Sequence, residues 1–522
     1  MSYTVKQKIG KNIYAYEVVS YYDKEKKQPR QKRIYLGRVD PETNEIVQTD
    51  RMKASIPKSA KSFGLVHLLD HVGESIGLKK ALAQAFPNKW KEMLSLSFFE
   101  LSEGKPLYLF PQWLEDTYIP YLNKRDSISS QSISKLLKEI GERDAKIEQF
   151  FIDWIPEVED TSSVIFDITS ISSYSNCIDT VEWGYNRDKE NLPQINLGMV
   201  FGEPSSLPLF YSLYQGSIPD IVTLKNILLR LNSFGIKDTL FVMDRGFFSR
   251  HNIDMMCEDN IKFIMPMSQN KLSKELLLKH REDLSSPLNF FMHNGNIIFS
   301  VEEPIEIDKH KLYAFIYLDK QRELEEIERF LKGLAGVERE VKDHSFKDID
   351  EAKEFIESER RGISKYFIIR LNRGKVTLLR KEDEIVEDVN RMGKMIIVTN
   401  LENMEKEKVL FLYKRRNDVE RLFDILKNDI DGNRIRNHSN ETMEGKLFLL
   451  FITLILYAAL DRVMVHKGLY KEQSLSNIIY ELKKLKVVET NNGKRFLTEI
   501  SKTQKTIYKE FEVPIPEVDI VI

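Results

Sequence analysis

The segment SSVIFDITSIS (residues 162–172) decides the fold, because it joins a run of large apolar residues to a single carboxylate. Val164, Ile165 and Phe166 are adjacent β-branched or aromatic residues, which is typical of a strand buried on both faces of a sheet. We expect this strand to end at Asp167. A strand buried in this way indicates an α/β fold in which helices cover the sheet.

A second segment, DTLFVMDRGFFSR (residues 238–250), repeats the pattern, with an apolar run over 240–243 followed by Asp244. In open α/β sheets the functional crevice lies beyond the carboxyl ends of the strands, so we expect Asp167 and Asp244 to meet there. Each aspartate has a structural alternative as a helix N-cap or turn residue, since Thr169 follows the first and Arg-Gly follows the second.

A third segment, YKRRNDVERLFDILK (residues 413–427), predicts an amphipathic helix that carries a third carboxylate, Glu420. At about 100° per residue, Tyr413, Arg416, Glu420 and Lys427 share an arc roughly 60° wide, and the opposite face is apolar. A mixed-charge outer face is also common on ordinary surface helices. Facing the two strands, however, Glu420 would join Asp167 and Asp244.

Three convergent carboxylates repel one another unless cations bind between them. Oxygen ligands of this kind favour Mg²⁺, and two ions about 4 Å apart can clamp the attacking and leaving oxygens of a phosphoryl displacement. We therefore expect Asp167, Asp244 and Glu420 to be catalytic and to bind two Mg²⁺ ions, for which Mn²⁺ should substitute.

The order Asp167, Asp244, Glu420, with Asp-x-Thr, Asp-Arg-Gly and Tyr-x2-Arg-x3-Glu-x6-Lys around them, resembles the DDE transposases of bacterial insertion sequences. The resemblance covers residues 160–440 and extends to the subgroup with the Tyr-Arg-Glu-Lys signature. It implies an RNase H-like catalytic domain, nicking of transposon ends and joining of the freed 3′-hydroxyl to target DNA. It also implies double-stranded DNA partners, namely terminal inverted repeats and target, and a homodimer in the synaptic complex.

The basic residues of the third segment are candidates for DNA binding. Arg416 can hold a phosphate bidentately and Lys427 as a point charge, while Tyr413 offers a hydroxyl. The resemblance implies that these three contact the DNA backbone near the cleaved end. Arg415 and Arg421 can extend the basic track, although solvated surface also explains them.

The segment EWGYNRDKE (residues 182–190) carries two aromatic residues, Trp183 and Tyr185. Each can stack on an unpaired base. Packing in the core or in a hairpin is the commoner role for such residues, and we expect it here.

The spacing predicts the domain organisation. The interval from Asp167 to Asp244 has room for strands over 194–200 and 208–214 and a helix over 220–234, whereas the interval from Asp244 to Glu420 is far longer than one connection needs. The resemblance implies a β-rich insertion there. We expect a small β-rich N-terminal module at 1–55, a helical DNA-binding region at 56–155, the first part of an RNase H-like mixed sheet flanked by helices at 156–270, an α+β insertion subdomain at 271–392, the second part with the signature helix at 393–470, and a C-terminal helical region and tail at 471–522.

Several expectations concern the ends of the chain. The polar DKEKKQPRQKR (residues 23–33) is a DNA-contact candidate or a solvated hairpin tip, SLSNIIYELKKLKVVET (474–490) predicts a closing helix before an extended tail, and the apolar 447–460 predicts a buried helix over the far layer of the catalytic sheet. That apolar stretch is shorter than the roughly 20 residues needed to span a bilayer. No apolar signal opens the sequence. We therefore expect no membrane partner and a cytoplasmic, prokaryotic protein, associated with the nucleoid when bound to DNA.

The composition fits an enzyme of a reducing compartment. The 522 residues include 42% hydrophobic residues, which is ample for several domains, and the two cysteines show no metal-ligand spacing. A net charge of −2 argues mildly against nucleic acid, but DNA affinity depends on local clusters of basic residues. Two alternatives remain, namely a metal-dependent nuclease of the same fold that cuts without joining, and a non-catalytic DNA-binding protein derived from a transposase.

Overall fold

The computed structural model describes residues 2–23, 28–47, 57–122, 128–158, 161–188, 190–372, 374–430, 432 and 434–517. The chain forms two compact units. Unit 1 consists of Met1–Lys146 and Glu444–Ile522, and unit 2 consists of Ile147–Met443. Both ends of the chain therefore belong to one unit, and the three predicted catalytic carboxylates all belong to the other.

Unit 2 is built on a mixed sheet, which has ten strands in the described part of the chain in the order β11-β12-β13-β16-β10-β9-β6-β7-β8, with β17 paired to β6. The half of the sheet that contains Asp167 and precedes Asp244 comprises β6 (Ser163–Ser173), β7 (Gln194–Gly202), β8 (Pro208–Gln215), β9 (Leu240–Met243) and β10 (Lys262–Pro266). The first three are antiparallel, β9 is parallel to β6, and β10 is parallel to β9. This order and direction make the sheet RNase H-like, which confirms the predicted fold class.

The predicted elements between the two aspartates are present. The strands correspond to β7 and β8, and the helix is α8 (Asp220–Ser233), followed after β9 by α9 (Arg250–Glu258). Both β6 and β7 are buried along their whole length. Phe166 packs on Phe247 on one face of the sheet, with ring centroids 4.9 Å apart, and Phe201 packs on Phe423 on the other face at 5.8 Å. Both faces of the strands are therefore covered, as their apolar sequences require.

The first strand does not end at Asp167 as we expected. β6 continues to Ser173, because its antiparallel pairing with β7 runs on to Ser172. Its other edge changes partner: β9 pairs with residues up to Phe166, and β17 (Arg434–Ile435) pairs with Ser172 and Ser173. Asp167 thus lies inside a strand but just beyond the end of its parallel neighbour.

The expected insertion at 271–392 is divided in the structure. After α10 (Lys271–Lys279), the strands β11 (Phe290–His293), β12 (Asn296–Ile307) and β13 (His310–Asp319) extend the central sheet, since β13 pairs with β16 (Lys394–Thr399). The expected β-rich segment is therefore an extension of the sheet rather than a separate body.

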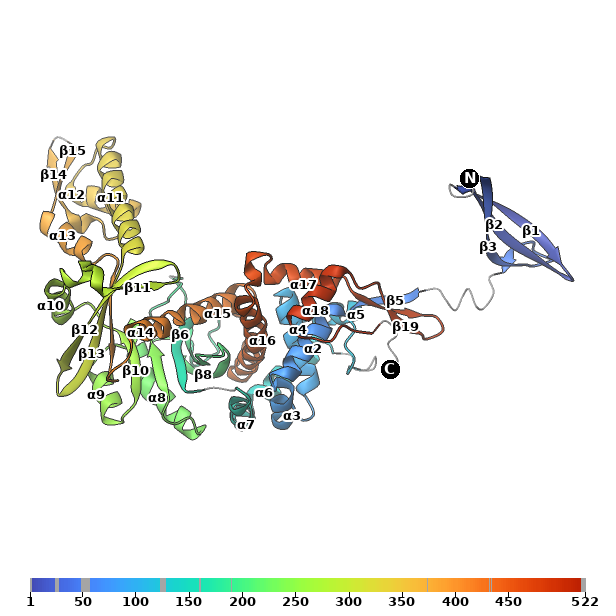
Figure 1. Cartoon of the computed structure of the whole chain (residues 1–522), viewed down its shortest axis with the longest axis horizontal. Helices are drawn as coiled ribbons and strands as arrows, with labels where there is room; N and C mark the ends of the chain where they lie inside the picture. The colour runs from blue at the N-terminus through green and yellow to red at the C-terminus, as the bar shows by residue number, and fades with distance from the viewer. Residues whose placement is uncertain are drawn as a thin grey trace. The chain divides into compact units, whose positions relative to one another are not determined.

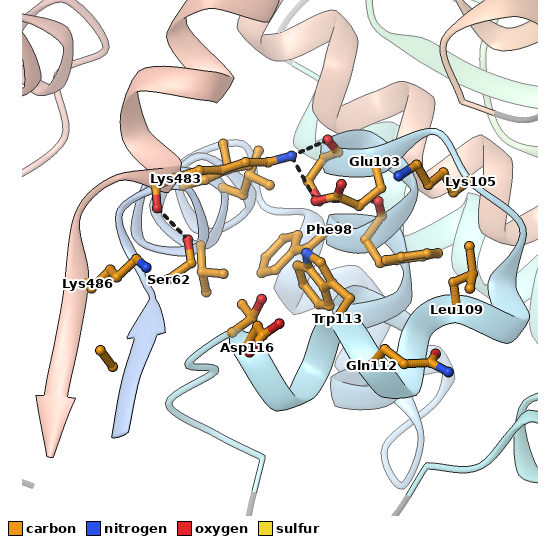
Figure 2. A pocket seen from close by; sticks show the side chains of 17 residues that line it. Ser62, Phe98, Glu103, Lys105, Leu109, Gln112, Trp113, Asp116, Lys483 and Lys486 are labelled. Carbon is orange, nitrogen blue, oxygen red and sulfur yellow. Dashed lines mark hydrogen bonds and ion pairs between the residues drawn. The ribbon is translucent and has the colours of Figure 1, made fainter. Parts of the chain in front are cut away.

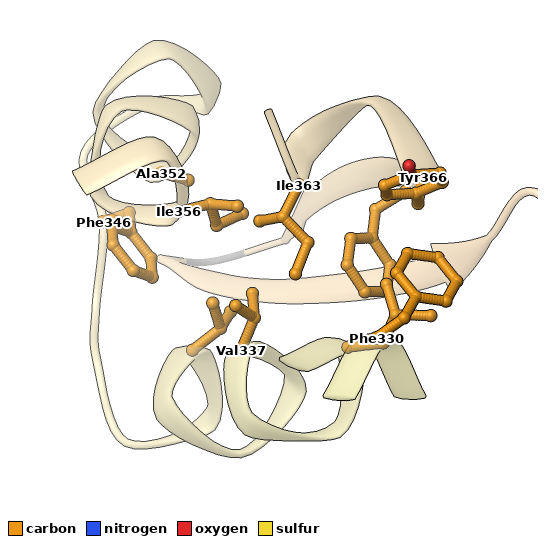
Figure 3. Close-up of a cluster of buried hydrophobic side chains, with 10 residues drawn as sticks. Phe330, Val337, Phe346, Ala352, Ile356, Ile363 and Tyr366 are labelled. Carbon is orange, nitrogen blue, oxygen red and sulfur yellow. The ribbon is translucent and has the colours of Figure 1, made fainter. Parts of the chain in front are cut away.

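The remaining segment, residues 320–392, has a core of its own and is called the insert below. It contains α11 (Lys320–Lys342), α12 (Ile349–Glu359), β14 (Phe367–Asn372), β15 (Lys375–Arg380) and α13 (Glu382–Arg391), which gather together in Figure 1. Phe330, Leu334 and Val337 recur at helical spacing on α11 and pack with Ile356 and Tyr366 (Figure 3).

Unit 1 has an N-terminal sheet of β1 (Ser2–Ile9), β2 (Asn12–Asp23), β3 (Gln28–Val39) and β4 (Ile46–Val47), as expected for a β-rich module. The tip of the basic hairpin, residues 24–27, lies outside the described residues. The helical region comprises α2 (Gly64–Ser75), α3 (Leu78–Ala85), α4 (Trp90–Glu103), α5 (Phe110–Asp116), α6 (Ser130–Gly141) and the start of α7 (Asp144–Trp154).

The C-terminal part of unit 1 differs from our expectation. The closing helix α17 (Leu475–Lys483) is shorter than predicted, because the β-branched residues after it form β18 (Lys486–Thr490). β18 pairs with β19 (Arg495–Leu497) and with β5 (Pro57–Ser62), and the expected extended tail contains α18 (Lys502–Glu510).

The long apolar helix α16 (Asn440–His466) belongs to unit 1 from Glu444 onward, and the expectation that it covers the far layer of the central sheet stays a prediction. Within unit 1 it approaches α6 so closely that a Cβ on Gly445 would lie 1.9 Å from the carbonyl oxygen of Leu137. Among the described residues it is the one helix long and apolar enough to cross a membrane, by length and composition only, and 78% of the apolar window is buried inside the protein.

Candidate active site

The register between β6 and β9 places two carboxylates at the same level. Phe166 and Met243 are register partners, so Asp167 and Asp244 follow directly on neighbouring parallel strands. Such strands lie about 4.8 Å apart. Asp244 also caps the short helix η3 (Arg245–Phe247), accepting a hydrogen bond from the Arg245 N–H at 2.6 Å. The capping role considered for Asp244 is therefore real and coexists with its place beside Asp167.

The third carboxylate, Glu420, lies on α15 (Arg416–Asn428). This helix follows α14 (Lys406–Lys414), with only Arg415 between them. The predicted single helix is thus interrupted at Arg415. The apolar face of α15 is buried, and the helix lies against β6 (Figure 1). Tyr413, at the end of α14, remains next to Arg416, whose guanidinium lies 5.8 Å from the centroid of the ring.

Arg416 brings the three carboxylates together. Its Nη1 lies 3.2 Å from Oδ2 of Asp167, while its Nη2 lies 2.5 Å from Oε1 of Glu420 and 3.7 Å from Oδ1 of Asp244. The Arg416 side chain is only 11% exposed. The residue that we predicted as an exposed phosphate ligand is therefore the common ion-pair partner of the three predicted catalytic residues.

Burial dominates the electrostatics of the site. It raises the pKa of Asp167 to about 6, and the charge of Asp244 adds to this rise, whereas the positive charges of Arg416 and Arg187 oppose it. Burial acts to lower the pKa of Arg416, but the carboxylates of Asp167 and Asp244 outweigh it, so that pKa lies above its ordinary value. Burial also raises the pKa of the Tyr413 phenol. Arg416 thus remains charged while Asp167 is poised to exchange a proton near neutral pH.

The donor set fits a hard divalent cation, because three carboxylates already direct oxygen atoms at one cationic group. In the described part of the chain, no three Asp, Glu, His or Cys side chains are arranged to share a metal ion. The guanidinium of Arg416 lies between the three carboxylates. The buried Nε of Arg416 has no hydrogen-bond partner, so its burial costs free energy of folding.

The other predicted DNA-binding residues have mixed surroundings. Arg415 belongs to an internal network: its Nη2 donates to the Glu203 carbonyl at 3.1 Å and to Ser206 Oγ at 2.7 Å, and its Nη1 pairs with Asp418 at 2.6 Å. Arg421 is 41% exposed and lies 3.6 Å from Asp418. A DNA contact by Arg415 would break this network, whereas Arg421 is partly exposed on α15.

The sequence analysis missed the acidic partner of Lys427, whose Nζ donates to Oδ2 of Asp188 at 2.6 Å. It also missed Arg187, which donates to Ser170 Oγ at 3.2 Å and contributes to the electrostatics of Asp167. Both lie in the segment EWGYNRDKE, where four charged residues follow two aromatic ones. That density of charge next to a catalytic strand is the signal that could have found them.

The expected packing of Trp183 and Tyr185 is wrong. Their side chains are 63% and 81% exposed. Neither ring therefore contributes to the core of unit 2, and large apolar groups that face solvent together often mark an interaction site.

A separate cavity of ≈ 580 Å³ lies within unit 1 (Figure 2). Phe98 and Trp113 contribute to its apolar wall. Lys483, on its rim, donates to Oε1 of Glu103 at 2.7 Å and to the Ser102 carbonyl at 2.7 Å. This lysine is thus already neutralised, and the cavity contains none of the predicted catalytic residues.

The geometry of two strand aspartates and a helix glutamate on an RNase H-like sheet defines an enzyme of the DDE class. The profile of the transposase DDE domain family matches residues 159–456, more than half of the chain, and this protein belongs to that family. It is therefore a DNA transposase. No curated protein sequence matches the chain.

One solved structure that resembles the chain is the cryo-EM structure of a piggyBac transposase synaptic complex with hairpin DNA. The similarity covers 80% of this chain and 70% of that one, with 11% sequence identity and a TM-score of 0.34. A TM-score of this size does not establish a shared fold, so the family assignment rests on the sequence match.

Proposed function

We propose that this transposase nicks the ends of its transposon and joins the freed 3′-hydroxyl to target DNA, with Asp167, Asp244 and Glu420 as its catalytic residues. The observation that supports this most strongly is their convergence on one guanidinium from two strands and a helix. Bound by these carboxylates, two Mg²⁺ ions, or Mn²⁺ in their place, would supply Lewis acidity to the attacking and leaving oxygens.

Arg416 has one role before metal ions bind and another role afterwards. In the absence of divalent ions it neutralises carboxylates that would otherwise repel one another. When cations bind those carboxylates, the guanidinium loses its partners and needs another anion, and a DNA phosphate held bidentately meets that need. Arg416 would then bind the cleaved strand, as the resemblance of the signature implies, with the Tyr413 hydroxyl beside it.

The partners follow from this activity. The substrates are the double-stranded terminal inverted repeats and the target DNA, and two copies of the chain would hold the paired ends. Arg421 offers a further phosphate contact on α15, since its side chain is partly exposed on the helix that carries Glu420. A location in the prokaryotic cytoplasm, at the nucleoid, matches these substrates.

The test is a cleavage and joining reaction with labelled DNA from both flanks of the gene, a supercoiled target and Mg²⁺. Wild-type protein and Glu420→Gln are compared, because this substitution keeps the size of the side chain and removes its charge. Joined products from wild type alone support the proposal. Cleavage without joining would replace it with a nuclease, and equal products from both proteins would remove Glu420 from the site.

A further inference from the structure

The segment 181–188, whose sequence is VEWGYNRD, is anchored to the end of the central sheet. Glu182 and Gln194 exchange backbone hydrogen bonds of 3.0 and 2.9 Å, and the Asn186 side-chain amide donates to Ser172 Oγ at 3.0 Å. Gly184 approaches Gly216 so closely that a Cβ would lie 1.9 Å from its carbonyl oxygen. The backbone that carries Trp183 and Tyr185 is therefore anchored to the sheet on both sides of the two rings.

This fixed segment presents aromatic rings to solvent. Trp183 and Tyr185 are 63% and 81% exposed, and Tyr174, just after β6, is 62% exposed. Exposed rings on a rigid support lose little further entropy when they bind, and each offers a flat apolar face. A group of rings of this kind indicates a ligand with flat, stackable faces.

The charged residues around the rings limit further which kind of ligand this surface can bind. Lys427 pairs with Asp188 at 2.6 Å, and Arg434 pairs with Glu190 at 2.7 Å while lying 5.4 Å from the Tyr174 ring centroid. The acidic residues thus offset the basic ones. A duplex presents phosphates and keeps its bases stacked inside, so it gains little from such a surface, whereas an unpaired strand exposes its base faces.

The segment that carries Trp183 and Tyr185 is linked to the two elements that carry Glu420 and Asp167. Lys427, which holds the segment through Asp188, is two helical turns from Glu420, or about 10 Å along α15 at the usual rise per residue. Arg187 links the same segment to β6 three residues beyond Asp167. A strand bound at Glu420 that follows α15 therefore comes to the segment that carries Trp183 and Tyr185.

We infer that Tyr174, Trp183 and Tyr185 form a stacking platform that holds an unpaired stretch of the DNA strand next to the scissile phosphate. This inference rests on the proposed function, because it places the platform on the substrate of that reaction. The platform binds base faces and so has little sequence preference. Its contribution is to keep the opened strand in place while the carboxylates act.

The experiment measures binding in the presence of a metal chelator, so that no cleavage occurs and no transposon sequence is needed. The probes are a fluorescein-labelled oligothymidine of about 20 nucleotides and a blunt duplex of equal length. The full-length variants are Trp183→Ala/Tyr185→Ala, the conservative Trp183→Phe/Tyr185→Phe, and a control, Phe290→Ala, which removes a ring that is 50% exposed on β11.

For the alanine pair we expect affinity for the single strand to fall at least about tenfold, while duplex affinity stays within about twofold. The phenylalanine pair and Phe290→Ala should bind the single strand nearly as wild type does. The single strand should also quench tryptophan fluorescence in wild type, and Trp183→Phe should lose that quenching.

Equal single-strand affinity in wild type and the alanine pair, or quenching that survives in Trp183→Phe, would overturn the platform. So would a wild-type protein that does not bind the single strand. These outcomes are separate from those of the joining reaction: a platform that binds in a protein that never joins DNA leaves the inference standing and removes the proposed function.

Discussion

Arg416 donates from Nη1 to Oδ2 of Asp167 at 3.2 Å, so a residue expected to hold DNA lies among residues expected to hold metal. Both groups are almost fully buried, and the pair therefore has few competing water molecules. A guanidinium and a divalent cation cannot share the same oxygen atoms.

Arg416→Ala should destabilise the metal-free protein and make its stability strongly dependent on divalent ions. Removing one partner of a buried ion pair costs about 3 kcal/mol, because the Asp167 carboxyl is left without its counter-charge. Mn²⁺ or Mg²⁺ should restore the free energy of unfolding by binding that carboxyl. Urea denaturation with chelator and with metal measures both effects.

The matched control for this prediction is Arg421→Ala, which removes an arginine from the same helix but from its exposed side. Its metal response should equal that of wild type. If Arg416→Ala gains no more stability from metal than wild type does, the competition between Arg416 and metal is refuted.

Glu420→Gln should reduce cleavage by at least about a thousandfold, because a neutral amide is a poor ligand for a hard cation. Affinity for transposon ends should change by less than about threefold, since the amide keeps the size of the side chain. Cleavage rates with Mg²⁺ and gel-shift titrations without it measure the two properties. Lost end binding in a folded variant would instead assign Glu420 to DNA recognition.

Asp167→Asn should stabilise the metal-free protein at neutral pH but not in acid. The folded-state pKa of Asp167 is raised from 3.8 to about 6, so its stabilising contribution is complete below pH 3.8 and is lost as the pH rises through about 6. Above that pH the charged, buried carboxyl costs the fold up to about 3 kcal/mol, which asparagine avoids.

The measurement is the free energy of unfolding of wild type and Asp167→Asn, both with chelator, near pH 4.5 and near pH 7.5. The gain from asparagine should be present at the higher pH and shrink at the lower one. A gain that is the same at both values would show that the titration of Asp167 does not contribute to stability.

Arg415→Ala should lower stability by about 2 kcal/mol without weakening the binding of DNA ends. The substitution removes the guanidinium that joins Glu203 to Asp418, and the loss of an ion-pair partner is costly for a buried carboxylate such as Glu203. Thermal unfolding and end binding are measured on the same preparation. Normal stability with weakened binding would support the DNA contact that the sequence suggested.

The sequence predicted the central sheet well, because its strands carry their own signal. Continuous apolar runs such as 164–166 and 240–243 mark strands buried on both faces, and the register that follows brings Asp167 beside Asp244. The predicted end of β6 at Asp167 was wrong for a physical reason. Its later residues include Ser170 and Ser172, which accept hydrogen bonds from Arg187 and Asn186 of a neighbouring segment, and polarity alone does not show that a strand has stopped.

The electrostatic arrangement of the site could not be read from the sequence. Helical periodicity places Arg416 and Glu420 on one face, but it does not say whether the arginine turns outward to DNA or inward to the strands. That choice depends on the depth at which α15 lies against β6, which is a tertiary property. The exposure of Trp183 could not be predicted from the sequence either. It depends on how the backbone of its segment lies against the sheet, which is also a tertiary property.

The insert leaves the central sheet and returns to it at the same place. Leu318 of β13 and Lys394 of β16 are register partners, and the Asp319 N–H donates to the Gly393 carbonyl at 2.9 Å, so the insert begins and ends at neighbouring backbone positions. A tight turn could join the two strands there without moving either of them. The insert also has its own core. Another domain could therefore replace it, in evolution or by grafting, without changing the register of β6 and β9.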